Sequence, residues 1–185
     1  ILRDASLSVP IDESEERLPP EQRYIQLSQL GGTAQVRYGQ VTLDITGRFR
    51  DSPVALKGKV TFGAEGFSIE NLGLDVQLAL KGVLLPTNDE HSTPAERRFV
   101  ERWFHLREFV ADYDPRGRAD FDLHFQKLPG KDKGIRFVDG MLTARGPSAR
   151  YFRFPYRLYD LAGCVYFRPD GRIELRDFNG VHGRG

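Results

Sequence analysis

Strict alternation of apolar and polar residues constrains the fold of this chain more than any other feature. The longest run places leucine or valine at every second position from Leu74 to Leu80, with Asp75 and Gln77 between them. Because successive side chains of a strand point to opposite faces of a sheet, a period of two predicts strands with one buried face. The same pattern returns in residues 4–9, 33–38, 40–45, 56–62, 120–125, 165–167 and 173–175.

Fully buried parallel strands would be apolar throughout, so the alternation favours antiparallel strands. The sequence therefore predicts a mainly β fold built on an antiparallel meander. Two architectures satisfy this pattern: one sheet curled into a groove, or two sheets packed as a sandwich.

Residues 94–111 break the alternation and predict a helix. Ser92 or Thr93 can cap it, Pro94 suits its first turn, and Pro115 follows its end. Its apolar stripe recurs at spacings of four, three and four residues and consists of Phe99, Trp103, Leu106 and Val110. This stripe is expected to pack on the sheet as a cap or plug. The flanking arginines leave a second possibility, a helix lying in a membrane interface.

The size of the chain suits one domain. Its 185 residues are enough to bury a core, and we expect residues 1–185 to form a single β-rich domain, with the acidic segment 11–22 as a solvated connection. The chain has no initiator methionine, no signal peptide and no apolar run of the roughly 20 residues that a membrane-spanning helix needs. We interpret it as part of a longer protein whose anchor and export signal lie outside this sequence.

Two segments, residues 24–49 and 156–181, share one pattern. Each has two leucines three residues apart and a glycine two residues later, then a strand, a turn, a strand of the form V/I-x-L and a closing glycine. The matched residues are Leu27 and Leu158, Leu30 and Leu161, Gly32 and Gly163, Val41 and Ile173, Leu43 and Leu175, and Gly47 and Gly180. Either the chain contains a repeated hairpin, or the match reflects how easily any two hairpins align. A repeat would make the end of the sequence, GVHGRG, the hinge into a further strand.

This pattern resembles the repeating hairpins of the AsmA-like and TamB-like envelope proteins. The segment FPYRLYDLAGCVYFRPDGRIELRDFNGVHG is most similar to the C-terminal AsmA-like region, and the resemblance covers residues 24–62 and 150–185. The helix over 94–111 departs from the simple repeat. The resemblance implies the periplasmic part of a protein anchored in the inner membrane, with a long curled sheet. In that family the apolar inner face is thought to hold lipid acyl chains and to carry phospholipid towards the outer membrane.

The sequence gives little support for catalysis. The glycines of GVHGRG lack the strand-to-helix context of a phosphate loop, and no histidine or cysteine pattern matches a metal site. Residues 112–123 begin like a calcium loop but end in Leu123 where glutamate is needed. Asp120 and Asp122 share one strand face with His124, which is compatible with acid–base chemistry, but we expect this face to be the ordinary wet face of a sheet. We expect no enzyme, no catalytic residue, no metal and no cofactor.

Segment 149–161 combines aromatic residues with arginines, which suggests nucleic-acid binding by stacking and phosphate contact. A net charge of +1 argues against a nucleic-acid partner, and Tyr151, Phe152, Phe154 and Tyr156 are more simply explained as a packed strand before a proline break.

The sequence-based hypothesis is therefore an apolar β-groove that holds lipid acyl chains and supports phospholipid transport and outer-membrane homeostasis. The predicted groove residues are Val41, Leu43, Ile45, Leu74, Val76, Leu78, Phe121, Leu123, Ile173 and Leu175. The expected partners are phospholipid or another lipid, adjacent repeats of the same chain and, through segments outside this sequence, a membrane. The alternative is a β-sandwich module with a structural or ligand-binding role and no lipid.

Overall fold

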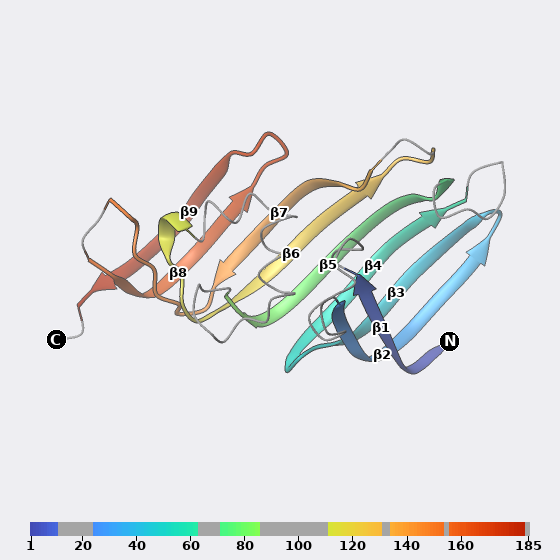
Figure 1. The fold of residues 1–185 in the computed structure, drawn as a ribbon, viewed down its shortest axis with the longest axis horizontal. Helices are drawn as coiled ribbons and strands as arrows, with labels where there is room; N and C mark the ends of the chain where they lie inside the picture. Colours follow the sequence, from blue (N-terminus) through green and yellow to red (C-terminus); the bar gives the residue numbers. More distant parts are fainter. Residues whose placement is uncertain (11–23, 63–70, 86–110, 131–133, 154–155, 184–185) are drawn as a thin grey trace, which may run out of the picture.

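The described strands form one open antiparallel sheet. The computed structural model describes residues 1–10, 24–62, 71–85, 111–130, 134–153 and 156–183. Within these ranges nine strands lie side by side in chain order and do not close into a barrel (Figure 1). The strands are β1 (Leu2–Pro10), β2 (Tyr24–Arg37), β3 (Gln40–Phe49), β4 (Ser52–Thr61), β5 (Gly73–Leu84), β6 (Arg118–Lys127), β7 (Arg136–Ala144), β8 (Leu158–Phe167) and β9 (Ile173–His182).

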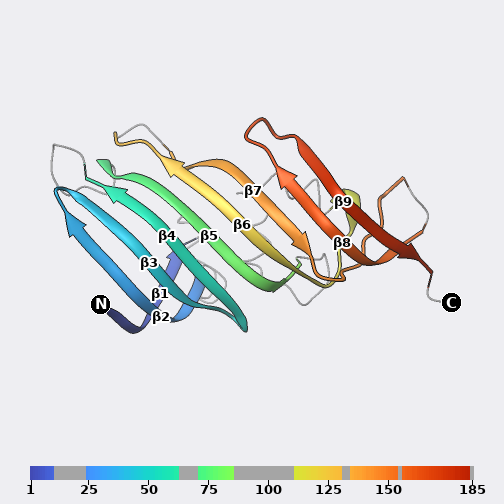
Figure 2. The ribbon, with the colours of Figure 1, turned by 180° about the vertical axis from the view of Figure 1, so that it is seen from behind.

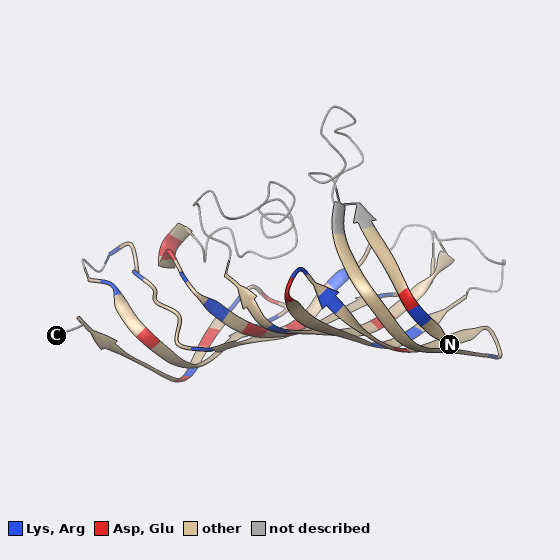
Figure 3. Ribbon diagram, turned by 90° about the horizontal axis from the view of Figure 1, so that it is seen from below, with Lys and Arg blue, Asp and Glu red and all other residues tan. Residues whose placement is uncertain are grey.

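The predicted mainly β, antiparallel fold is confirmed. Of the two predicted architectures, the described strands adopt the single curled sheet and not the sandwich. Both faces of the ribbon can be followed in Figures 1 and 2, and the view along the sheet shows its curvature (Figure 3). The predicted connection 11–22 and the helix stripe Phe99, Trp103, Leu106 and Val110 lie outside the described residues. Ala111, Asp112 and Tyr113 are helical, and this stretch ends before Pro115, as the sequence predicts.

The two hairpins predicted as copies, β2–β3 and β8–β9, share the same backbone irregularity. Gln29 and the matching Asp160 both have a positive φ, 51° and 48°. The pairing register shifts at this position in both hairpins, between Ser28 and Gly31 and between Tyr159 and Ala162. A residue with positive φ at a register shift is a β-bulge, which bends the strand. The common bulge supports a repeated hairpin over a chance alignment.

The glycine that follows each bulge is required by close strand contact. Gly32 and Gly163 have φ of 143° and 116°, a region that other residues rarely adopt. A Cβ at Gly163 would lie 2.6 Å from the carbonyl oxygen of Asp177. A Cβ at Gly32 would overlap the carbonyl oxygen of Asp44. The leucine-to-glycine spacing in the sequence thus marks a bulge, followed by a glycine that the backbone of the partner strand approaches closely.

The second matched glycine of each hairpin does not close its strand, contrary to our prediction. Gly47 and Gly180 lie inside β3 and β9, and each is covered by the buried leucine of its partner strand. A Cβ would lie 2.6 Å from Leu30 Cδ2 at Gly47 and 2.5 Å from Leu161 Cδ2 at Gly180. β9 continues through Gly180 to His182, so the first three residues of GVHGRG belong to the strand.

The core lies on one face of the sheet at its centre. Its buried members come mainly from β5 to β8 and are Val76, Leu85, Ala119, Phe121, Leu123, Phe125, Leu142, Val165 and Phe167. Burial of one such side chain contributes roughly 1.5–3 kcal/mol for the larger residues.

Candidate functional site

A continuous apolar surface crosses the sheet because the strands pair in register. One row of directly paired residues runs from β3 to β9 and consists of Ile45, Leu56, Leu78, Leu123, Gly140, Phe167 and Ile173. A second row consists of Gly47, Val54, Leu80, Phe121, Leu142, Val165 and Leu175. Directly paired residues share a face, so both rows lie on the same side of seven consecutive strands. We call this side the apolar face.

All ten predicted groove residues lie on the apolar face, since Val41, Leu43, Leu74 and Val76 belong to parallel rows. They differ in exposure. Val76, Phe121 and Leu123 are buried in the core, whereas Val41, Leu43, Ile45, Leu74 and Leu78 are half-buried. Val76, Phe121 and Leu123 therefore belong to the buried core cluster, whereas the other seven predicted groove residues keep part of their side chains exposed.

The apolar face is open at its two flanks. Val36 of β2 is 68% exposed, and Ile173 and Leu175 of β9 are 40% and 50% exposed. β9 lies at one edge of the sheet, so only β8 packs beside it among the described strands. A side chain at a sheet edge has neighbours on one side only, which explains the higher exposure.

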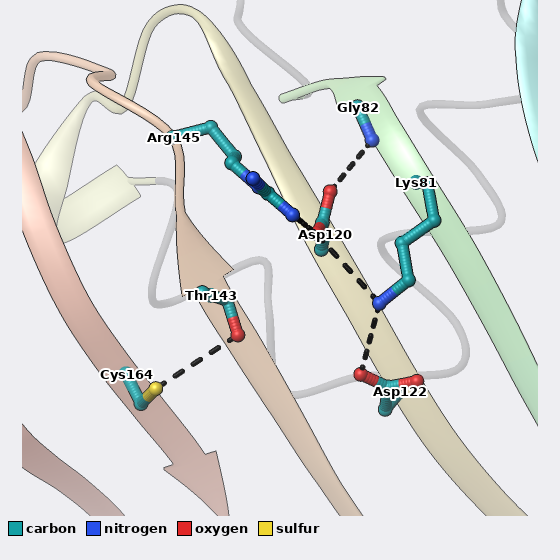
Figure 4. Close-up of polar contacts among 7 residues, drawn as sticks. All are labelled: Lys81, Gly82, Asp120, Asp122, Thr143, Arg145 and Cys164. Atoms are coloured by element: carbon teal, nitrogen blue, oxygen red, sulfur yellow. Dashed lines mark hydrogen bonds and ion pairs between the residues drawn. The ribbon is translucent and has the colours of Figure 1, made fainter.

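The opposite face is polar and holds a buried carboxylate. Asp120 of β6 is almost fully buried and faces a bulge in β5, where the register shifts between Leu80 and Val83. The amide of Gly82 (φ 60°) donates to Asp120 Oδ1 at 2.8 Å, and Arg145 donates to Oδ2 from Nε at 2.9 Å (Figure 4). Lys81 Nζ lies 3.6 Å from Asp120 and 3.5 Å from Asp122.

These contacts change the ionisation of Asp120. Burial raises its pKa, but the hydrogen bonds from Arg145 and Gly82 and the charge of Lys81 lower it by more, so the net pKa is below the ordinary value. The carboxylate therefore stays charged and holds the bulge of β5 against β6 and the end of β7. Our expectation of a uniformly wet polar face is wrong for Asp120.

His124 has a separate partner on the same face. His124 Nε2 lies 2.7 Å from Asp75 Oδ1, and since a carboxylate only accepts, the ring nitrogen donates. This bond is the main reason that the pKa of Asp75 is lowered; burial opposes it, and Gln126 and Lys59 add to it. Asp120, Asp122 and His124 thus lie beside Arg145, Lys81 and Asp75 respectively.

A shallow hollow of about 430 Å³ lies on the polar face beside His124. Its charged lining includes Lys57, Asp122, Asp139 and Arg168. The two cations are already paired: Lys57 with Asp44 at 3.4 Å and Arg168 with Glu174 at 2.8 Å. The hollow therefore offers no unpaired lysine or arginine to an anionic ligand. In the described part of the chain, no three histidine, cysteine or acidic side chains come together as a metal-binding group.

The aromatic segment 149–161 differs from our expectation of a packed strand. Between β7 and β8 the described residues 150–153 form no strand, and Phe152 and Tyr156 are 58% and 53% exposed. The prediction of a packed strand is wrong for Tyr151, Phe152 and Tyr156, because the chain leaves the sheet after Ala144; Phe154 lies outside the described residues. His182 is exposed, and its ring centroid lies 4.5 Å from that of Tyr156.

Within the described ranges, no helix has both the length and the apolar character needed to span a bilayer. Comparisons with protein-family models, with curated proteins and with solved structures found no match.

Proposed function

We propose that this chain is a segment of an AsmA-like envelope protein and that its apolar face holds lipid acyl chains. The observation that carries the proposal is the apolar face itself. It runs in register across seven strands of a sheet that is curled but not closed. An open sheet with one apolar face has to cover that face, and acyl chains offer apolar surface without hydrogen-bonding groups.

The flanks are the places where acyl chains would bind. The centre of the apolar face is buried in the core, so it exposes little surface to a ligand. Val36 on one flank and Ile173 and Leu175 on the other expose apolar surface that a chain of methylenes can cover. Each methylene that leaves water contributes about 0.8 kcal/mol.

The repeated hairpin supports the family assignment. The bulge at Gln29 and Asp160 and the close-contact glycines Gly32 and Gly163 recur in both copies. A repeated unit that adds two strands at a time extends the sheet and its apolar face together. This is the architecture that the resemblance to AsmA-like proteins implies, with a periplasmic location.

Photo-crosslinking from the two faces of one strand tests the proposal. A benzophenone amino acid placed at Leu175, on the apolar face, should capture co-purified phospholipid several-fold better than the same group at Arg176, which points to the opposite face. Val36 and Arg37 form the matched pair on the other flank. Mass spectrometry of the adducts identifies the lipid class. Equal capture from both faces, or none from Leu175 and Val36, contradicts the proposal.

A further inference from the structure

The connection between β7 and β8 carries exposed aromatic rings beside unbalanced positive charge. Residues 145–157 contain four arginines and no aspartate or glutamate. Among the described residues of this stretch, Phe152 and Tyr156 are mostly exposed and Tyr151 is 37% exposed. We call Arg150, Tyr151, Phe152, Arg153 and Tyr156 the aromatic–arginine loop. It lies at the end of the sheet that holds the C-terminus (Figures 1 and 3).

The loop is held in place by the segment before β6. The amide of Arg150 donates to the carbonyl oxygen of Tyr113 and the amide of Phe152 to that of Asp112, both at 2.7 Å. The rings of Tyr113 and Tyr151 stack with centroids 5.0 Å apart, and Phe152 packs edge-on against Tyr151 at 4.9 Å. The aromatic rings are therefore displayed from a fixed backbone, which lowers the entropy lost on binding.

The charges around the loop leave a positive surplus. Asp114 forms ion pairs with Arg157, with Arg116 at 3.7 Å and with Arg150 at 3.8 Å. Arg153 lies over the Phe152 ring, 5.1 Å from its centroid. Four arginines (Arg116, Arg150, Arg153 and Arg157) against two carboxylates (Asp112 and Asp114) leave a net charge of +2.

We propose that the aromatic–arginine loop docks on the surface of a bilayer that contains anionic phospholipid. Tyrosine and phenylalanine with arginine suit this interface, because the rings reach the acyl boundary while the guanidinium groups stay at the headgroup phosphates. A single-stranded nucleic acid fits less well. Stacking of bases needs open ring faces, whereas Tyr151 is stacked on Tyr113 and Arg153 covers the ring of Phe152. The docking uses loop residues and goes beyond the holding of acyl chains on the apolar face.

Vesicle co-sedimentation of the 185-residue chain tests the docking. Binding to phosphatidylcholine vesicles that contain phosphatidylglycerol should be strong at low salt, weaker at high salt, and weak on pure phosphatidylcholine. The double variant Arg150→Gln with Arg153→Gln should lose affinity for the anionic vesicles by about fivefold per arginine. Phe152→Ser should weaken binding to the same vesicles at both salt concentrations.

The turn at the other end of the sheet provides matched controls. Tyr38 is fully exposed and follows the exposed Arg37, so Tyr38→Ser and Arg37→Gln remove the same chemistry at a distant site. These variants should bind vesicles as the unmodified chain does, and urea unfolding should show all variants equally folded. Three results would overturn the proposal. Vesicle binding could be independent of phosphatidylglycerol, it could persist in the double arginine variant, or it could fall equally in the Tyr38 variant. Arginine-dependent binding of a single-stranded oligonucleotide without vesicle binding would also overturn it.

These results are separable from the function proposed for the apolar face. If the chain does not bind vesicles but Leu175 still captures lipid, only the docking proposal for the loop is contradicted. If the chain binds vesicles but Leu175 captures no lipid, only the proposed function of the apolar face is contradicted.

Discussion

The hairpins β2–β3 and β8–β9 share two internal features but have different surroundings. Both contain a bulge at the third residue of an L-x-x-L pattern, and both place a buried leucine over a glycine of the partner strand. They differ at the outer edge: β3 pairs with β4 along its whole length, whereas β9 has no further partner among the described strands. As a result Val41 and Leu43 are half-buried, while the matching Ile173 and Leu175 are exposed.

This difference separates two levels of structure. The bulge and the close-contact glycine depend on residues within the hairpin, so they recur wherever the pattern recurs. The exposure of the apolar side chains depends on the neighbouring strand, which the hairpin sequence does not specify. The following predictions test this separation, from the largest expected effect to the smallest.

Replacement of the glycine after each bulge should have the largest effect. Gly32→Ala and Gly163→Ala place a Cβ against the neighbouring backbone at a positive φ, and each should lower the free energy of unfolding by about 3–5 kcal/mol. Urea denaturation followed by circular dichroism measures the loss. Gly134→Ala is the control, because a Cβ there meets nothing within 4 Å and no positive φ is needed. If either Gly32→Ala or Gly163→Ala lowers the free energy of unfolding by less than Gly134→Ala does, the two glycine sites are not equivalent.

The buried leucines should come next, with equal cost in both hairpins. Leu30 and Leu161 are 6% and 2% exposed, and truncation of either to alanine should destabilise the chain by about 3 kcal/mol through lost burial and the cavity that remains. A comparison of urea midpoints at equal m-values gives the difference between the two variants. A large cost for one variant and almost none for the other would mean that the shared sequence does not impose shared packing.

The matched residues Leu43 and Leu175 should behave differently. Leu43→Asn removes a half-buried side chain beside β4 and should lower the free energy of unfolding by about 1–2 kcal/mol, whereas Leu175→Asn should cost about 0.5 kcal/mol. Thermal unfolding of both variants in lipid-free buffer measures the two effects. Equal losses would contradict the conclusion that the neighbouring strand determines burial.

The smallest effect concerns a carboxylate that only the second hairpin contains. Glu174 accepts hydrogen bonds from Arg168 at 2.8 Å and Arg176 at 3.1 Å, which lower its pKa to about 2, while the matching residue of the first hairpin is Thr42. Because the folded pKa lies below the unfolded one, the stabilisation is present above about pH 4.5 and is lost as the pH falls towards 2. Carboxyl NMR titration measures the pKa directly, and Arg168→Gln should raise it. A Glu174 pKa near 4.5 in the unmodified chain would contradict this assignment.

Much of the fold could be predicted from the sequence, because the period-two pattern is a local property. The alternation over 74–80 and 120–125 correctly placed strands and their apolar faces, and the spacing of Leu158, Leu161 and Gly163 marked the bulge that β8 shares with β2. The roles of Gly47 and Gly180 were missed, because nothing in β3 or β9 alone shows that a leucine of the partner strand lies over them. The sequence also gave no sign that Asp120 is buried, since its partners Gly82 and Arg145 are distant in the chain.

The candidate site divides in the same way. Period-two alternation determined which side chains belong to the apolar face, because neighbouring residues of a strand must point to opposite sides. Only the tertiary structure decided which of them are accessible. Val76, Phe121 and Leu123 are buried in the core cluster of β5 to β8, whereas Ile173 and Leu175 are exposed on the edge strand β9, and burial of this kind depends on contacts between segments that are far apart in the sequence.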